Sequence, residues 1–272
     1  MTRLDQMLVA RGLARSRTHA ARLIAEGKVS SDGASLTKAS LQIEEPTELT
    51  VAAGTEDTYV SRAGHKLAGA LDAFPDIAVA GKRCLDAGAS TGGFTDVLLR
   101  RGAAQVVAVD VGHGQLVPQL REDARVEVHE GINVRYMTAD DIGGPVAVTV
   151  ADLSFISLTL VMAPLAYCTE PGGDLVLMVK PQFEIGKDRL GRTGVVTSEL
   201  ERRRAVAKVA SAAAESGLDL RGLATSPLPG QDGNVEYFLW IRRRIVPDLP
   251  KIEEQDAAVA ALLGTIWPTP HH

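Results

Sequence analysis

The sequence contains no long hydrophobic run, very few cysteines and no sign of a leader peptide. A helix that spans a bilayer needs about 20 consecutive apolar residues, and no stretch of these 272 residues approaches that length. The N-terminal stretch MTRLDQMLVARGLARSR also lacks the apolar core and the cleavage site of a signal peptide. We therefore expect a cytoplasmic protein without a membrane segment.

Metal or disulfide chemistry and a uniformly basic surface are also excluded. The two cysteines, Cys84 and Cys168, lie in apolar contexts without the spacing of metal ligands, so we interpret them as buried free thiols and predict no metal site. The net charge of −5 argues against a protein that binds nucleic acid over its whole surface. A basic patch on one segment is still compatible with that charge.

The basic residues gather at the N-terminal end of the chain. Residues 1–38 contain seven arginines and lysines against three acidic residues. Apolar residues at helical spacing predict two short helices there, the first ending near Gly12, and strand-like pieces with a turn at 31–33 predict a small hairpin sheet after them. A module of about 55 residues buries little surface, so we expect it to accompany a larger domain.

This N-terminal pattern, RLDQMLVARGLARSRTHAARLIAEGKVSSDG, resembles the S4 RNA-binding module. Arginines on a helix face can bind RNA phosphates through paired hydrogen bonds, which agrees with the resemblance. The alternative is that these charges only form solvated helix faces. The residues that we predict to bind RNA are Arg3, Arg11, Arg15, Arg17 and Lys38.

From residue 83 onward, strand-like apolar runs alternate with helical segments. The predicted strands contain RCLDAGA, QVVAVD, VEVHE, VAVTVADL, DLVLMVK and VEYFLWIRRR, and a last helix is predicted over 253–263. This alternation is typical of the α/β class, with a doubly wound, mostly parallel sheet covered by helices on both faces. Ligands of such sheets bind at the carboxyl ends of the strands, near the point where the strand order reverses.

The stretch DAGASTGGFTDVLLRRG predicts a strand, a glycine-rich turn and a helix that begins near Gly92. It does not match G-x-G-x-x-G, and no G-K-[ST] follows, which argues against a dinucleotide fingerprint and a phosphate-binding loop. The next strand ends in Asp110, whose carboxylate could bind both hydroxyls of a ribose. The pattern favours an adenosine-containing ligand, and the alternative is an ordinary tight turn.

Together with ADLSFISL, VKPQFEIG and GNVEYFLW, this stretch resembles the S-adenosylmethionine-dependent ribose methyltransferases of the FtsJ/RrmJ-like fold, over residues 60 to 245. With an S4-like module ahead of it, the chain is similar to the TlyA family, whose members methylate the 2'-hydroxyl of rRNA cytidines and are also called haemolysins. The resemblance implies S-adenosylmethionine as the cofactor. The donor-binding residues that it implies are Gly88, Ser90, Thr91, Gly92, Gly93, Asp110 and Asn133, the last of which could instead only cap or turn the chain.

The run LVLMVKPQFEIG is a buried strand that finishes on a lysine, Lys180. Burial beside other cations favours the neutral form of a lysine, which can accept a proton from a ribose hydroxyl. Through SRAGHKL, ADLS, VKPQ and NVEYF, the resemblance implies a catalytic set of Lys66, Asp152, Lys180 and Glu236. We favour Lys180 as the base, oriented by Asp152, although the sequence does not decide between the two lysines. Each residue alone could be a surface ion pair.

The connection between the two regions departs from the family pattern. An Arg-x-Trp-Val element is expected before SR, and this chain reads EDTYV, so Tyr59 is the candidate for the aromatic position. We predict an S4-like domain over 1–59, a linker at about 53–60 and a methyltransferase domain over 61–272.

The predicted function is methylation of a ribose 2'-hydroxyl on rRNA cytidines of the small ribosomal subunit, the large one or both. The predicted partner is thus rRNA within ribosomal subunits, without a membrane and without an obligate protein partner. Three alternatives stay open: a non-catalytic RNA-binding or assembly factor, a membrane-active haemolysin, and a methyltransferase that acts on a base or a small molecule.

Overall fold

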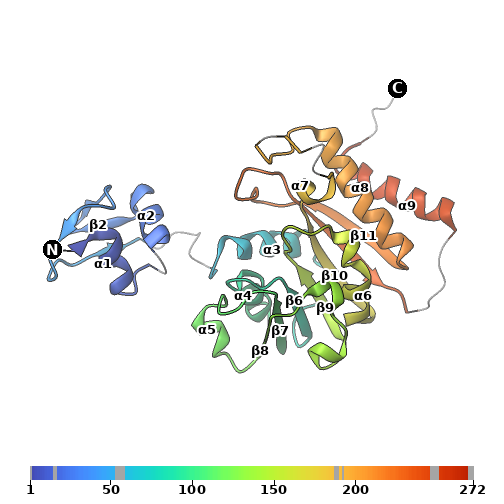
Figure 1. The fold of residues 1–272 in the computed structure, drawn as a ribbon, viewed down its shortest axis with the longest axis horizontal. Coiled ribbons are helices and arrows are strands. Elements are labelled where there is room, and N and C mark those ends of the chain that lie inside the picture. Colours follow the sequence, from blue (N-terminus) through green and yellow to red (C-terminus); the bar gives the residue numbers. More distant parts are fainter. Residues whose placement is uncertain are drawn as a thin grey trace. The chain divides into compact units, whose positions relative to one another are not determined.

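The computed structural model describes residues 2–14, 17–52, 59–186, 190–191, 193–245 and 251–268. Contacts within the chain divide it into two units, Met1–Thr58 and Tyr59–His272, each of which is described by itself (Figure 1). Most of the linker predicted at 53–60 lies outside the described residues.

The first unit is a small α+β module. Its elements are β1 (Thr2–Arg3), α1 (Leu4–Ala10), α2 (Arg17–Ala25), β2 (Val29–Ser31), β3 (Ala34–Ser35), β4 (Gln42–Ile43) and β5 (Thr50–Val51). The strands form an antiparallel sheet in the order β3-β2-β5 and a separate β1-β4 pair. Leu4 and Leu8 of α1 pack with Leu23 and Ile24 of α2 in one buried core. The two helices and the small sheet expected from the sequence are therefore confirmed.

A buried carboxylate joins α1 to the arginines around it. Asp5, whose side chain is 6% exposed, accepts hydrogen bonds from Arg3 Nε at 3.0 Å and from Arg17 Nη2 at 3.1 Å. The bonds from Arg3, with further help from Arg17, lower the pKa of Asp5 to about 2, although burial alone would raise it. Two of the arginines predicted to bind RNA are thus held by one acidic side chain.

The second unit is built on a seven-stranded sheet in the order β11-β12-β10-β9-β6-β7-β8. Its strands are β6 (Arg83–Ala87), β7 (Gln105–Asp110), β8 (Val126–Glu130), β9 (Val146–Ala151), β10 (Thr169–Val179), β11 (Leu218–Thr225) and β12 (Tyr237–Arg243). The strands from β8 to β10 pair in parallel, and β12 is antiparallel to both of its neighbours. The order reverses beside β6, because β7 lies on one side of it and β9 on the other, and this is where such sheets bind ligands.

Helices cover both faces of this sheet (Figure 1). One face carries α3 (Arg62–Ala73), α4 (Gly93–Arg100) and α5 (Pro118–Arg121), and the other carries α6 (Met162–Cys168), α8 (Glu199–Glu215) and α9 (Ile252–Gly264). Shorter turns connect these layers: α7 (Pro181–Glu184), η2 (Val134–Tyr136), η3 (Asp140–Ile142) and η4 (Leu158–Leu160). The doubly wound α/β fold and the last helix agree with the sequence-based expectation.

The first residues of the second unit pack against α4, the helix that follows the glycine-rich turn. The backbone N–H of Val60 donates to Asp96 Oδ2 at 2.9 Å, and Arg100 Nε donates to Asp96 Oδ1 at 2.7 Å. The ring of Tyr59 lies 5.0 Å from that of His65 and under the guanidinium of Arg100 at 5.2 Å. Tyr59 therefore occupies an aromatic anchoring position against α3 and α4.

No helix among the residues that the structure describes is long and apolar enough to cross a bilayer.

The Asp5 contacts predict an acid-dependent loss of structure in the first unit. A carboxyl group whose pKa is lower in the folded than in the unfolded chain stabilises the fold above pH 4 and loses this effect as the pH falls toward 2. We expect Asp5→Asn to lower the protection of the α1 amides against hydrogen exchange at pH 6. We also expect the variant to lose most of the fall in this protection that the parent shows between pH 4 and pH 2. Hydrogen exchange of residues 2–14 in the full chain measures both effects. Equal acid sensitivity in the variant and the parent would contradict the assignment.

Candidate active site

The glycine-rich turn between β6 and α4 brings the backbone close to a neighbouring strand. Gly88 and Gly92 have φ values of +87° and +97°, which other residues rarely adopt. A Cβ atom on Gly88 would lie 2.8 Å from the carbonyl oxygen of Asp152, so only glycine fits there. Gly92 is the N-cap residue of α4, and a Cβ atom there would collide with Leu120 rather than point into a cavity.

Asp110, at the end of β7, holds this turn in place. Its Oδ2 accepts the backbone N–H of Ser90 at 2.8 Å, and its Oδ1 accepts the N–H of Gly112, also at 2.8 Å. Ser90 itself has a φ of +48°, a strained conformation for a residue with a side chain. Each carboxylate oxygen keeps a free lone pair, so Asp110 can still accept hydrogen bonds from a ligand.

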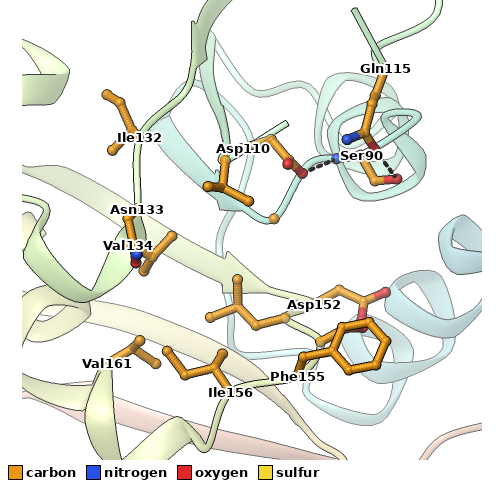
Figure 2. A pocket seen from close by; sticks show the side chains of 14 residues that line it. Ser90, Asp110, Gln115, Ile132, Asn133, Val134, Asp152, Phe155, Ile156 and Val161 are labelled. Carbon is orange, nitrogen blue, oxygen red and sulfur yellow. Dashed lines mark hydrogen bonds between the residues drawn. The ribbon is translucent and has the colours of Figure 1, made fainter. Parts of the chain in front are cut away.

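A cavity of about 600 Å³ opens beside the turn. Ser90, Asp110, Gln115 and Asn133 provide polar groups in its wall, and Ile132, Val134, Ile156 and Val161 provide apolar surface (Figure 2). Its volume lies in the range of small-molecule sites, about 300–1,000 Å³. Apolar walls for a flat ring and a carboxylate for hydroxyl groups fit an adenosine-containing ligand.

Asn133 has two roles in this wall. It lines the cavity, and its Oδ1 also accepts the backbone N–H of Arg135 at 3.0 Å, which caps η2. The capping role considered from the sequence is therefore real and does not remove the side chain from the cavity.

A second, smaller cavity of about 170 Å³ shares part of its wall with the first. Gly88, Ser90, Asp152 and Ser154 line both cavities. Thr91, Gly93 and Lys180 line only the smaller one. A ligand in the large cavity and a group in the small one can therefore meet at the glycine-rich turn.

Strand register explains why the four predicted catalytic residues converge. Val179 of β10 pairs with Tyr237 of β12. Because the two strands are antiparallel, Lys180 directly after β10 and Glu236 directly before β12 lie at the same end of this pair. Asp152 directly follows β9, which pairs in parallel with both β6 and β10. All three residues therefore lie at the carboxyl edge of the sheet, while Lys66 comes from the overlying helix α3.

These four residues form two close ion pairs. Lys66 Nζ lies 2.6 Å from Glu236 Oε2, and Lys180 Nζ lies 2.6 Å from Asp152 Oδ1. Lys180 directs a hydrogen bond to Ser154 Oγ at 2.8 Å, and among the described residues no donor reaches Asp152 Oδ1 with hydrogen-bond geometry. Each lysine is therefore paired with a carboxylate, and the charged partner of Lys180 is Asp152 rather than the cations that the sequence analysis expected beside it.

Asp86 is a fully buried carboxyl group near this site. Thr95 donates its hydroxyl hydrogen to Oδ2 at 2.7 Å, whereas Oδ1 has no partner within the described part of the chain. Burial raises the pKa of Asp86 to about 7, against the effect of Thr95, and the negative charges of Asp152 and Asp110 raise it further. The group therefore changes its charge near neutral pH.

Sequence analysis missed several residues that shape the site, although all of them lie inside the motifs that it quoted. Phe155 lines the large cavity, is 91% exposed as a residue and has a φ of +64°. Asn234, two residues before Glu236, is buried and accepts a hydrogen bond from the backbone N–H of Val196 at 2.9 Å. Buried Glu184 binds the loop after β9. A polar residue inside an apolar motif was the available signal for Asn234 and Glu184.

The predicted RNA-binding residues belong to the first unit, and several are engaged within it. Arg3 and Arg17 bind Asp5, and Arg11 donates to the carbonyl oxygens of Thr47, at 2.5 Å, and Glu45. Lys38 is exposed. Arg15 lies outside the described residues, so its role stays a prediction.

Comparisons with known proteins agree with this architecture. The FtsJ-like methyltransferase family model matches residues 59–243, and the S4 domain model matches residues 2–48. The fold and the site thus define an FtsJ-like methyltransferase joined to an S4 domain.

The relatives narrow this class further. The chain is 56% identical over 240 residues to the 16S/23S rRNA (cytidine-2'-O)-methyltransferase TlyA of Mycobacterium tuberculosis, covering 88% of this chain and 89% of the relative. It is 36% identical to Hemolysin A of Brachyspira hyodysenteriae, covering 87% and 98%. A solved structure from Streptococcus thermophilus that carries the hemolysin name superimposes with a TM-score of 0.72 at 36% identity, covering 98% and 97%. The chain belongs to the TlyA family.

The buried Asp86 predicts that stability falls as the pH rises. Its pKa is higher in the folded than in the unfolded chain, so its contribution is complete below about pH 4 and disappears as the pH rises through 7. The Asp86→Asn side chain cannot ionise, so we expect the free energy of unfolding of this variant to lose the pH dependence. At pH 8 we expect the variant to be more stable than the parent by a few kcal/mol at most, since one pKa unit is worth about 1.4 kcal/mol.

Denaturant unfolding of both proteins at pH 5, 6, 7 and 8, followed by tryptophan fluorescence, measures this difference. A parallel pH dependence in the two proteins would show that Asp86 does not titrate in this range.

Proposed function

We propose that this protein transfers a methyl group from S-adenosylmethionine to the 2'-hydroxyl of cytidines in the rRNA of ribosomal subunits, and so acts in the cytoplasm. The observation that supports this most strongly is the pair of cavities that share a wall at the glycine-rich turn, with Lys180 and Asp152 lining the smaller one. The relative that is 56% identical to this chain is named as a 16S/23S rRNA (cytidine-2'-O)-methyltransferase.

The large cavity is the proposed donor site. Asp110 accepts hydrogen bonds from the donor's ribose hydroxyls, and Gly88 lets the turn pack closely against the Asp152 backbone beside the donor. Ser90 and Asn133 add polar contacts in this cavity, and Gly92 sets the path of the chain into α4. Thr91 and Gly93, which the sequence analysis also assigned to the donor, line the smaller cavity instead. When bound, S-adenosylmethionine supplies an electrophilic methyl group.

The small cavity is the proposed site of the target ribose. Lys180 Nζ, in its neutral form, accepts the proton of the 2'-hydroxyl and makes its oxygen a better nucleophile. The ammonium group that results is stabilised by Asp152 at 2.6 Å and by the Ser154 hydroxyl. Because this stabilisation grows as the proton arrives, it favours the transition state over the ground state. Lys66 and Glu236 line neither of these two cavities, and their ion pair supports the site by joining α3 to the start of β12.

Two further surfaces suit an RNA substrate. The S4 unit offers arginine and lysine side chains to phosphates, with Asp5 setting the directions of Arg3 and Arg17. Phe155 exposes an aromatic ring at the wall of the large cavity, where a nucleotide turned out of its helix can stack. Both features favour a structured RNA over a small molecule as the methyl acceptor.

Labelled S-adenosylmethionine, incubated with purified protein and separate unmodified small and large subunits, tests this function. We expect label on cytidine ribose, at positions that resist alkaline cleavage because the 2'-oxygen is blocked. Donor binding without transfer to RNA would instead indicate an RNA-binding or assembly factor. Label on a base would indicate a base methyltransferase, and leakage of liposomes by the purified protein would favour the haemolysin alternative.

Lys180→Ala tests the proposed base. We expect methyl transfer to fall by at least about 100-fold, the usual size of a general-base contribution, while the dissociation constant of the donor changes by less than about threefold. Lys82→Ala, which removes an exposed lysine, is the matched control and should retain full turnover. Normal turnover in the Lys180 variant would remove it from the mechanism.

A further inference from the structure

We infer that Glu184 is a positioning residue for the reaction, because it holds the loop of residues 153–158 between the two cavities and the base. The expected effect on turnover rests on the proposed function, whereas the contacts of Glu184 with the loop are independent of it. Glu184 is the last residue of the one-turn helix α7, whose N-cap residue is Lys180.

Glu184 binds the C-terminal end of the loop through both of its carboxylate oxygens. Oε1 accepts the backbone N–H of Leu158 at 2.8 Å, and Oε2 accepts the hydroxyl hydrogen of Ser157 at 2.5 Å. The residue is only 4% exposed, so water competes little for these bonds. A buried carboxylate with two such partners fixes both the position and the orientation of the backbone that it contacts.

The N-terminal end of the same loop is held from the other end of α7. Lys180 Nζ donates to Ser154 Oγ at 2.8 Å. One helical turn therefore contacts the loop at two points, Ser154 through Lys180 and Ser157–Leu158 through Glu184. A shift of the loop at one point must be transmitted to the other, because both anchors belong to the same short helix.

The residue between these two anchors explains why they are needed. Phe155 has a φ of +64°, a left-handed conformation that a bulky side chain adopts only when its surroundings enforce it. The residue is 91% exposed, and its ring lies beside the ring of Phe183 of α7, with centroids 5.2 Å apart. Exposed surface cannot impose a strained backbone, so the anchors on either side of Phe155 must do so.

The charge of Glu184 is balanced from α8, away from the loop. Lys208 Nζ lies 3.7 Å from Glu184 Oε2 and donates to the backbone oxygen of Glu184 at 2.9 Å. Lys208 touches neither Ser157 nor Leu158 through these bonds. Replacing it therefore separates the charge balance of Glu184 from its contacts with the loop.

Loss of these contacts should affect the reaction more than the binding of the donor. Residues 153–156 form one side of the large cavity, whereas Asp110 and Asn133 lie on another. Ser154 is a partner of the base itself, and a small misplacement of reacting groups can cost up to about 100-fold in rate. A relaxed loop thus weakens donor binding modestly and disturbs Lys180 strongly.

The decisive experiment compares Glu184→Ala, Glu184→Gln and Lys208→Met in the full chain. Glu184→Gln keeps one acceptor for Leu158 and a polar group for Ser157. With unmodified ribosomal subunits as substrate, we expect kcat of Glu184→Ala to fall about 10- to 100-fold while the donor dissociation constant rises less than about fivefold. Glu184→Gln should recover most of this loss, and Lys208→Met should stay within about threefold of the parent.

Hydrogen exchange at the Leu158 amide is the second readout and does not depend on catalysis. We expect Glu184→Ala to exchange there at least about tenfold faster than the parent, with unchanged protection in β9 and β10. If the parent shows no methyl transfer, the proposed function fails and this measurement alone decides the inference.

Three outcomes would overturn the inference. The first is parent-like kcat in Glu184→Ala, and the second is unchanged exchange at Leu158. The third is a loss of turnover that matches a loss of folded protein, with donor binding and the protection of β9 falling to the same extent. In that last case Glu184 would only stabilise the fold.

Discussion

The pairing of Lys180 with Asp152 is the interaction on which the site depends. A lysine at the end of a buried strand carries a large desolvation penalty unless a carboxylate lies beside it, and the Nζ–Oδ1 separation here is 2.6 Å. The same pairing gives Lys180 a direction, because its remaining hydrogen bond goes to Ser154. The pair thereby fixes Lys180 Nζ in the wall of the smaller cavity, where the proposed base must lie.

The parallel sheet makes this arrangement possible because it brings strand ends from distant parts of the chain to one edge. The turn after β6, Asp110 at the end of β7 and Asp152 after β9 all lie at the carboxyl ends of their strands, and β7 and β9 both pair with β6. Close packing of Gly88 against the Asp152 backbone then joins the donor cavity to the smaller cavity beside Lys180. Gly88, Ser90, Asp152 and Ser154 form the wall that the two cavities share.

Acidic residues hold basic ones in place in both units of the chain. In the S4 unit, the buried carboxylate of Asp5 holds both Arg3 and Arg17. Two guanidinium groups are thus ordered, while only one of their two positive charges is neutralised. In the methyltransferase unit, Asp152 and Glu236 do the same for the two lysines. An enzyme with a net charge of −5 can therefore present local positive groups whose directions are set before RNA arrives.

The sequence by itself determined the fold class and the two kinds of domain, and the family resemblance pointed to three charged residues at the sheet edge and to Lys66 of α3. Alternating apolar runs predict strands and helices locally, and a charged residue at the end of a buried run is visible without coordinates. Only the tertiary structure decided which lysine pairs with which carboxylate and that Asp5 binds Arg3 and Arg17. It also decided that Glu184 binds the loop after β9 and that Phe155 lines the large cavity. These relations depend on strand register and loop path, since a single residue of shift in register would bring different side chains together.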